Sequence, residues 1–191
     1  MTRNIIFAGV GGQGILSIAT IIGDAATRTG INLKQAEVHG MSQRGGDVQS
    51  NMRLSTEKIW SDLIPEGKAD IIISMEPMEA MRYLPYLNKE GWVITSTDTF
   101  RNIPTYPEDE AVIEELNKID NLVSLPIEQI AKDNSMPKCA NVILLGMASK
   151  YLSIISAEEL RKSIINVFER KGDSIVEMNL KAFDLGVELA K

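Results

Sequence analysis

The strongest constraint on the fold of this chain lies near its N-terminus, where a strand, a glycine-rich turn and a helix follow one another. Residues 4–10 read NIIFAGV, an apolar, β-branched run that ends in glycines. Such a run is typical of a strand buried on both faces of a parallel sheet. Apolar residues then recur at three- and four-residue steps until Gly30: Ile15, Ile18, Ala19, Ile22 and Ala26. This spacing predicts an amphipathic helix, and we expect the preceding strand to be the first and central one.

The alternation of strands and helices continues along the chain. Pro77 stands at a plausible first helical position, directly after a buried strand candidate. Residues 97–107, TDTFRNIPTYP, carry two prolines and suit an irregular surface excursion. The further strand candidates are residues 31–38, 48–55, 70–75, 92–96 and 121–125.

Beyond Pro137 the pattern is helical nearly to the end of the chain. One helix is expected over about residues 140–152, and Ser156 with Glu159 forms a capping box that opens the next. The last helix carries an apolar stripe of Val176, Leu180, Phe183, Val187 and Ala190. The whole pattern predicts an α/β protein with a Rossmann-like, three-layer αβα fold, a mostly parallel sheet and a helical C-terminal region, in a single domain over residues 1–191.

Charge and cysteine content exclude several classes of function. The 20 Lys+Arg and 26 Asp+Glu residues give a net charge of −6, which disfavours general nucleic-acid binding. The single cysteine, Cys139, excludes an internal disulfide and cannot supply the four thiolates of an iron–sulfur cluster. We therefore expect no metal site in this chain. With no apolar run of ~20 residues and no signal-peptide pattern, we expect a cytoplasmic protein that does not enter membranes.

The first candidate site is the glycine motif after the first strand. Gly9, Gly11 and Gly14 satisfy the pattern G-x-G-x-x-G, with Gly12 and Gln13 between them, in the context of a strand followed by a helix. Glycines there permit a tight turn and let the backbone and the helix N–H groups approach an anion closely. The alternative is that these glycines only make the first crossover compact.

A nicotinamide-binding protein would also need an acidic residue at the end of the second strand, about 20 residues after the glycines. Glu37 lies in about this place. However, Glu37 leads into an unusually polar run, EVHGMSQRGGD, which dinucleotide binding alone does not require.

This polar run is the second candidate site. Arg44, followed by Gly45 and Gly46, presents a guanidinium suited to a carboxylate or phosphate. Glu37 and His39 are two residues apart at a strand end, so both would point to the same side. The structural alternatives are an ion pair of Arg44 with Asp47 or Glu37 and a histidine that only shapes the loop.

The residues of both motifs resemble a known family. GVGGQG after the first strand, the later QAEVHGMSQRGG, and Asn179 before Ala182 and Gly186 are similar to the gamma domain of 2-oxoacid:ferredoxin oxidoreductases, most closely of the indolepyruvate type. The resemblance runs over nearly the whole chain. Members of this family have a Rossmann-like α/β fold, which agrees with the pattern of strands and helices.

The resemblance implies a coenzyme A-dependent oxidative decarboxylation of an aryl pyruvate to an arylacetyl-coenzyme A, with reduction of ferredoxin. In the family, thiamine diphosphate and the iron–sulfur clusters belong to a large alpha subunit, so this chain is expected to be inactive without that partner. Alternatives are the gamma subunit of another 2-oxoacid:ferredoxin oxidoreductase, a free-standing NAD(P)-dependent oxidoreductase, and a nucleotide-sensing or scaffold module.

The resemblance also implies roles for the candidate residues. The turn glycines would face an anionic group of the 2-oxoacid or of coenzyme A. His39 and Arg44 are the candidate catalytic residues, with no proton-transfer step assigned to His39. Both would face the partner's cofactor together with Ser42 and Gln43. The candidate cofactor-binding set is Gly9, Gly11, Gly12, Gln13, Gly14, Glu37, Ser42, Gln43, Gly45 and Gly46.

If Arg44 clamps an anion, Arg44→Ala should raise the KM for the 2-oxoacid or coenzyme A in the complex and leave assembly intact. The expected loss is roughly 2 to 4 kcal/mol, that of a buried charged hydrogen bond. Steady-state kinetics with each substrate varied in turn measures it. Unchanged kinetics would show that Arg44 is structural, and His39→Asn probes the same loop separately.

Overall fold

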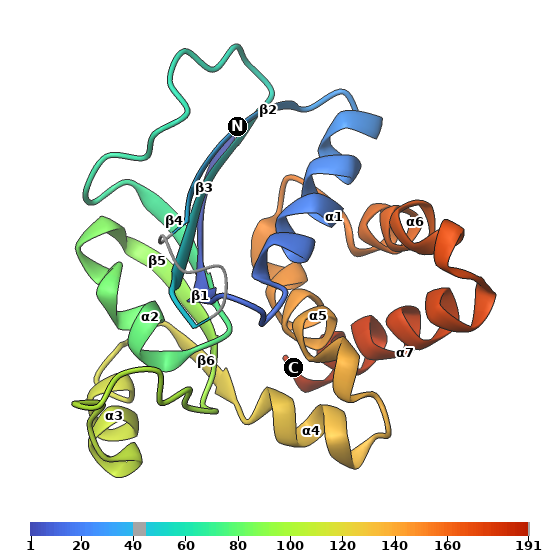
Figure 1. Cartoon of the computed structure of the whole chain (residues 1–191). Helices are drawn as coiled ribbons and strands as arrows, with labels where there is room; N and C mark the ends of the chain where they lie inside the picture. Colours follow the sequence, from blue (N-terminus) through green and yellow to red (C-terminus); the bar gives the residue numbers. More distant parts are fainter. Residues whose placement is uncertain (40–44, 191) are drawn as a thin grey trace.

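The computed structural model describes residues 1–39 and 45–190, and these form a sheet with helices on both faces (Figure 1). The strands are β1 (Thr2–Val10), β2 (Asn32–His39), β3 (Asp47–Ser55), β4 (Ala69–Ser74), β5 (Leu87–Ser96) and β6 (Leu122–Leu125). The α-helices are α1 (Ile15–Arg28), α2 (Pro77–Arg82), α3 (Asp109–Leu116), α4 (Ile127–Asp133), α5 (Ala140–Leu152), α6 (Ala157–Phe168) and α7 (Asp173–Leu189). Short 3-10 turns are η1 (Leu84–Tyr86), η2 (Pro137–Cys139) and η3 (Glu169–Lys171).

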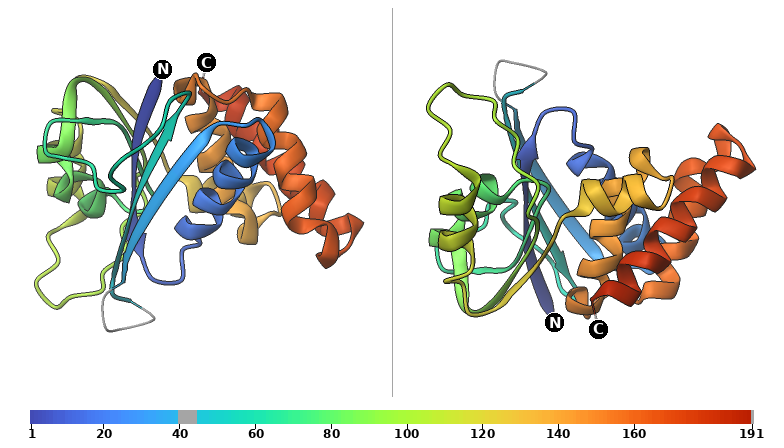
Figure 2. Two further views of the ribbon diagram at one scale, coloured as in Figure 1. Left: turned by 90° about the horizontal axis from the view of Figure 1, so that it is seen from above. Right: turned by 90° about the horizontal axis from the view of Figure 1, so that it is seen from below.

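The three layers are plain when the molecule is viewed along the sheet (Figure 2). Helices α1, α5, α6 and α7 lie on one side of the sheet, and α2 and α3 lie on the other. The predicted three-layer α/β fold with a helical C-terminal region is therefore confirmed. None of the helices in residues 1–39 and 45–190 has the length and apolar character needed to cross a membrane.

The sheet is mixed, with strand order β2-β3-β1-β4-β5-β6. β1, β4, β5 and β6 run parallel to one another, which confirms a mostly parallel sheet with β1 near its centre. β3 is the exception, because it pairs antiparallel with both β1 and β2. Asn51 of β3 accordingly lies opposite Ile6 of β1 and Ala36 of β2.

The position of β3 separates the first two strands of the chain. In the common dinucleotide-binding order the second strand lies directly beside the first. Here the chain leaves β2, turns back as β3 and fills that place itself. Since neighbouring strands are about 4.8 Å apart, β2 lies roughly 10 Å from β1.

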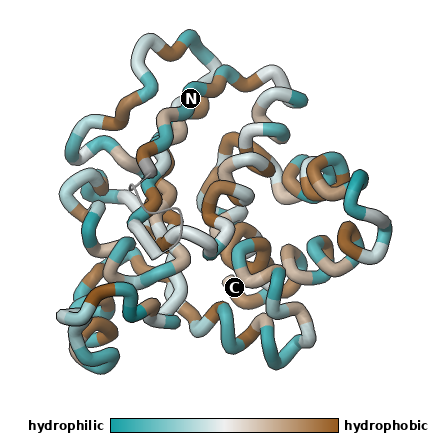
Figure 3. Tube along the Cα trace, in the orientation of Figure 1, coloured by the Kyte–Doolittle hydropathy of each residue, from teal (hydrophilic) through white to brown (hydrophobic). Residues whose placement is uncertain are grey.

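The core lies on both faces of β1. Ile5 and Phe7 pack in the larger cluster, toward α1 and α5, whereas Ile6 and Ala8 pack in a smaller one with Ala80 of α2. All four β1 residues are fully buried, as predicted for a strand covered on both sides. Figure 3 shows the hydrophobic residues concentrated along the strands and the helices that face them.

The loop prediction and the Ser156 half of the predicted capping box are confirmed, whereas Glu159 Oε1 accepts a hydrogen bond from Lys162 Nζ (2.7 Å). The Ser156 hydroxyl accepts a hydrogen bond from the N–H of Glu159 (3.2 Å) at the start of α6. Between β5 and α3, residues 97–108 form neither helix nor strand. β5 is longer than expected, because it begins at Leu87 and not at residue 92.

The buried face of α7 differs from the predicted stripe. Phe183 and the trailing Ala190 are buried as expected, but Val176, Leu180 and Val187 are only half-buried. The residues of α7 that are buried are Asn179, Ala182, Phe183 and Gly186. The physical reason is the close approach of α5, which requires small residues at the crossing and not large apolar ones.

Two glycines make that crossing possible. A Cβ added to Gly186 would lie 2.0 Å from the carbonyl oxygen of Ile143, and one added to Gly146 would lie 2.2 Å from that of Phe183. Both obstacles are backbone atoms, which cannot turn aside as a side chain can. The backbones of α5 and α7 are therefore in direct contact.

Gly186→Ala should lower the free energy of unfolding by roughly 3 kcal/mol or more, since overpacking against backbone forces the two helices apart. Gly23→Ala is the matched control, because a Cβ there meets only Leu33 at an ordinary 3.7 Å and alanine favours the helix. Urea unfolding of both variants tests this. Equal stability of the Gly186→Ala variant and the native chain would contradict the described crossing.

Candidate functional site

The glycine turn joins the end of β1 to the start of α1. Gly12 has φ +106° and Gly14 has φ +79°, conformations that side chains other than glycine rarely adopt. Gly14 is the N-cap of α1, and this residue has no side chain that could cap the helix end. The N-terminus of α1, with its partial positive charge, is therefore left open to an anion.

The side chain of Gln13 braces the turn from within. Its Oε1 accepts the N–H of Val10 (2.8 Å), and its Nε2 donates to the carbonyl of Met75 at the end of β4 (3.3 Å). A Cβ on Gly9 would come within 3.2 Å of the same Oε1. Gln13 and Gly9 thus shape the turn, whose exposed part is formed by Gly12.

The two glycine motifs meet at this turn. The N–H of Gly11 donates to the carbonyl of Gly46 (2.8 Å), and the N–H of Gly45 donates to the carbonyl of Gly11 (3.3 Å). Both bonds extend the β1–β3 pairing beyond the ends of the strands. The structure therefore brings together the glycines that the sequence singled out in separate segments.

The remaining predicted residues lie elsewhere or outside the described part. Ser42, Gln43 and Arg44 lie outside the described residues, as does the side chain of His39. Their roles stay predictions. Glu37 is exposed on β2, with β3 between it and β1, and its Oε1 accepts a hydrogen bond from Gln35 Nε2 (2.6 Å).

Two cavities flank the glycine turn. The larger, of 610 Å³, extends from the turn toward α7, and the smaller, of 350 Å³, extends toward α4. Both are lined by Gly12, Gln13, Lys138 and Asn141. The larger volume lies within the usual range of small-molecule sites, about 300–1,000 Å³.

Lysines surround these cavities. Lys138 borders both, Lys171 borders the larger and Lys132 the smaller. Glu128 is the one carboxylate among the described lining residues, and it borders only the smaller cavity. On a chain of net charge −6, this is a local concentration of positive charge beside an open helix N-terminus.

The sequence did not indicate these lysines. Lys132, Lys138 and Lys171 follow no motif. Their common property is spatial, because η2 and the helix ends next to it all face the glycine turn. The spacing of these lysines along the sequence does not indicate that they lie close together.

Asn141 ties the first turn of α5 to the glycine turn. Its Nδ2 donates to the carbonyl of Gly14 (3.0 Å). Asn179 borders the larger cavity but donates to Ile175 in its own helix (2.8 Å). Cys139 is 2% exposed, and burial raises the pKa of its thiol, so it is not an activated nucleophile.

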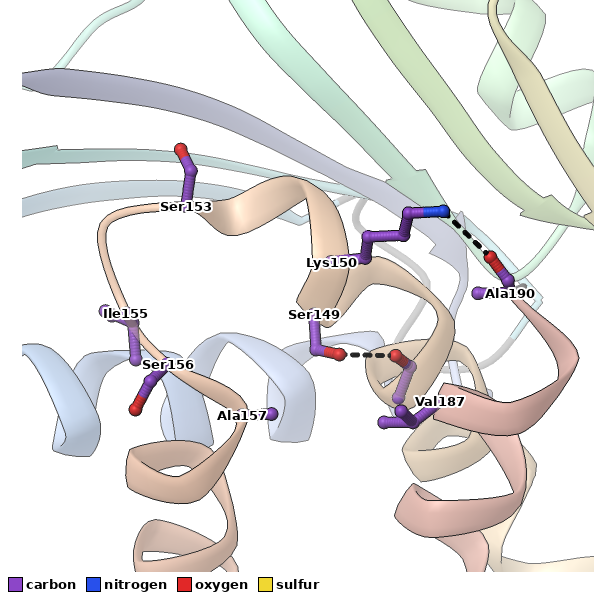
Figure 4. A pocket seen from close by; sticks show the side chains of 9 residues that line it. Ser149, Lys150, Ser153, Ile155, Ser156, Ala157, Val187 and Ala190 are labelled. Atoms are coloured by element: carbon purple, nitrogen blue, oxygen red, sulfur yellow. Dashed lines mark hydrogen bonds between the residues drawn. The ribbon is translucent and has the colours of Figure 1, made fainter.

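A third cavity, of 460 Å³, lies at the opposite end of β1 (Figure 4). Arg3, near the start of that strand, donates to Ser153 on its rim (2.7 Å). Ser149 donates to the carbonyl of Gly146 (2.7 Å), and Lys150 donates to that of Ala190 (3.4 Å). These polar groups are used within the fold, and none of the predicted site residues borders this cavity.

The sequence matches the family described as pyruvate ferredoxin/flavodoxin oxidoreductase over residues 4–189. The chain belongs to this family. The indolepyruvate oxidoreductase subunit IorB of Thermococcus kodakarensis is 36% identical to it over 98% of this chain and 96% of that protein. The relative is thus a subunit of a larger enzyme, and the predicted resemblance is confirmed.

Solved structures agree with this assignment. The gamma subunit of a keto/oxoacid ferredoxin oxidoreductase from Geobacter sulfurreducens PCA matches with a TM-score of 0.70 and 25% identity, over 98% of each chain. The 2-oxoglutarate:ferredoxin oxidoreductase from Magnetococcus marinus, which has 2-oxoglutarate, coenzyme A and succinyl-CoA bound, shares the fold with a TM-score of 0.77 at 22% identity. This chain spans 31% of that longer chain.

Gly14→Ala and Asn141→Ala should be strongly non-additive. The new Cβ in the first variant would lie 2.8 Å from Asn141 Nδ2, and Asn141→Ala removes that atom. We expect the double variant to be more stable than the sum of the two losses by about 1 kcal/mol. Chemical denaturation of the four proteins completes the cycle, and additive losses would speak against the described contact.

Proposed function

We propose that this chain is the small, gamma-type subunit of an indolepyruvate:ferredoxin oxidoreductase, with residues 1–191 forming one domain, and that it holds an anionic group of coenzyme A at the glycine turn. The observation that carries the proposal is the open N-terminus of α1, which lies beside two cavities bordered by Lys132, Lys138 and Lys171. The relationship to IorB supplies the class of reaction.

In this reaction an aryl pyruvate and coenzyme A give an arylacetyl-coenzyme A and carbon dioxide, while two ferredoxins each accept one electron and a proton is released. Thiamine diphosphate would supply the electron sink for the decarboxylation, and iron–sulfur clusters would carry the electrons. The lone, buried Cys139 does not fit a cluster site. We assign both cofactors to a large partner subunit, which also supplies the contact with ferredoxin.

The proposed part of this chain is electrostatic. Each of the three lysines is exposed, so each contributes only a small attraction, about 0.2 to 1 kcal/mol in water. The backbone N–H groups at the start of α1 add a charge-assisted contribution and fix the direction of the anion. Several weak, convergent groups suit a phosphate-bearing co-substrate that must bind and leave in every turnover.

The same geometry does not favour a free-standing nicotinamide enzyme. That function requires an acidic side chain beside the glycine turn to bind the ribose hydroxyls. Glu37, the candidate for this role, lies on β2 with β3 between it and β1. Only the glycine turn then supports the nicotinamide hypothesis.

Lys138→Ala should raise the KM for coenzyme A roughly three- to tenfold and leave kcat nearly unchanged, since it removes one charge-assisted contact made before the chemical step. Lys89→Ala is the control, because this exposed lysine on β5 borders neither cavity. Initial rates of ferredoxin reduction, measured in a complex assembled with the cluster-bearing large subunit, give both constants.

Two results would contradict the proposed function. One is turnover of a 2-oxoacid by the purified chain without the large subunit. The other is a KM for coenzyme A that responds no more to Lys138→Ala than to Lys89→Ala. Omitting each subunit in turn from the assay distinguishes the two cases.

A further inference from the structure

A buried carboxylate lies just beyond the end of β4, close to the glycine turn but outside it. Glu76 is 1% exposed, and its Oε2 accepts the N–H of Glu79 (2.8 Å), which caps α2. Its Oε1 accepts a hydrogen bond from the hydroxyl of Tyr106 and a longer one from the N–H of Phe100 (3.4 Å). Nothing in the proposed reaction uses this group.

Both donors to Oε1 come from one segment. We call residues 97–108, the irregular connection between β5 and α3, the strap. Phe100 and Tyr106 lie on either side of its middle, so a single carboxylate oxygen holds both flanks. A buried charge needs such partners, because without them its desolvation would strongly destabilise the fold.

The middle of the strap reaches the glycine turn. Asn102, between the two flanks, donates from Nδ2 to the carbonyl of Gly45 (2.9 Å). Gly45 in turn donates to the carbonyl of Gly11 (3.3 Å). A continuous path of hydrogen bonds therefore connects Glu76 to the strap, the strap to Gly45 and Gly45 to the turn.

The end of β4 also holds the turn from the other direction. The carbonyl of Met75 accepts the Nε2 of Gln13, and the next residue is Glu76. Met75 therefore holds Gln13, which supports the turn from inside. The next residue, Glu76, holds the strap, which contacts Gly45 beside the turn. Burial raises the pKa of the Glu76 carboxyl, whereas its hydrogen bonds from Tyr106, Glu79 and Phe100 oppose that rise.

We propose that Glu76 is a positioning residue for the anion site: through Tyr106 and Phe100 it holds the strap so that Asn102 fixes Gly45 against Gly11. In this arrangement the affinity of the turn for an anion depends on a carboxylate that never touches the anion. The inference rests on the proposed function for its effect on coenzyme A, but its structural part can be measured without any ligand.

Hydrogen exchange of the backbone amides tests the structural part in the full chain. Tyr106→Phe removes only the phenol hydroxyl, and Asn102→Ala removes the last side-chain link. Each should speed exchange at the Gly45 and Gly11 amides by roughly tenfold or more, with the amides of β1 and β4 unchanged. Tyr151→Phe, a similar change on α5 across the sheet, should affect neither glycine.

Kinetics in the assembled complex tests the functional part. Tyr106→Phe and Asn102→Ala should raise the KM for coenzyme A several-fold with kcat nearly unchanged, as for a site that is present but poorly held. Glu76→Gln should do the same if it folds. The proposal does not depend on it, since both strap variants leave the buried carboxylate in place.

The outcomes separate this inference from the proposed function. Unchanged exchange at both Gly45 and Gly11, or faster exchange throughout the sheet, overturns the positioning role. Faster local exchange with an unaltered KM also overturns it, provided that Lys138→Ala still raises the KM. If Lys138→Ala has no effect either, the proposed coenzyme A role is wrong and this inference falls with it.

Discussion

The organisation of this protein depends on two backbone hydrogen bonds between Gly11 and the pair Gly45–Gly46. They prolong the antiparallel pairing of β1 with β3 past the strand ends. A crossover connection without β3 would leave the glycine turn with no neighbouring backbone to pair with. These amide-to-carbonyl bonds require the two backbones to lie close together, and glycine on both sides permits this approach because it has no side chain. The two bonds hold the turn in one conformation without a ligand, so the proposed anion would bind with little ordering cost.

The antiparallel β3 also accounts for the proposed use of a familiar glycine motif for a ligand other than a dinucleotide. By lying between β1 and β2, it moves the acidic residue of the second strand away from the turn. The larger cavity beside the turn is then bordered by η2, η3, α5 and α7. Lys138 of η2 and Lys171 of η3 line it, and no carboxylate is among its described lining residues. The position of β3 between β1 and β2 thus changes which side chains lie beside the glycine turn, while the glycine motif itself stays the same.

Much of this could be predicted from the sequence, for physical reasons. The fully apolar run of β1, the helix periodicity of α1 and the Ser156 cap each express a local requirement, and each is confirmed. The antiparallel direction of β3 could not be predicted, because residues 48–55 look the same in either direction. The buried face of α7 was misassigned because close contact of two helix backbones favours small residues, which hydrophobic periodicity does not register. The lysines of the site are brought together only by tertiary packing.

The crossing of α5 and α7 has a consequence for how the larger cavity can vary. Asn141 borders this cavity from α5, and Ile175 and Met178 border it from α7. With the two main chains in contact at Gly146 and Gly186, the helices cannot approach each other further to make the space smaller. The dimensions of the cavity are therefore set by the reach of individual side chains projecting from a fixed frame, so that ligand preference would change in discrete steps, one residue at a time.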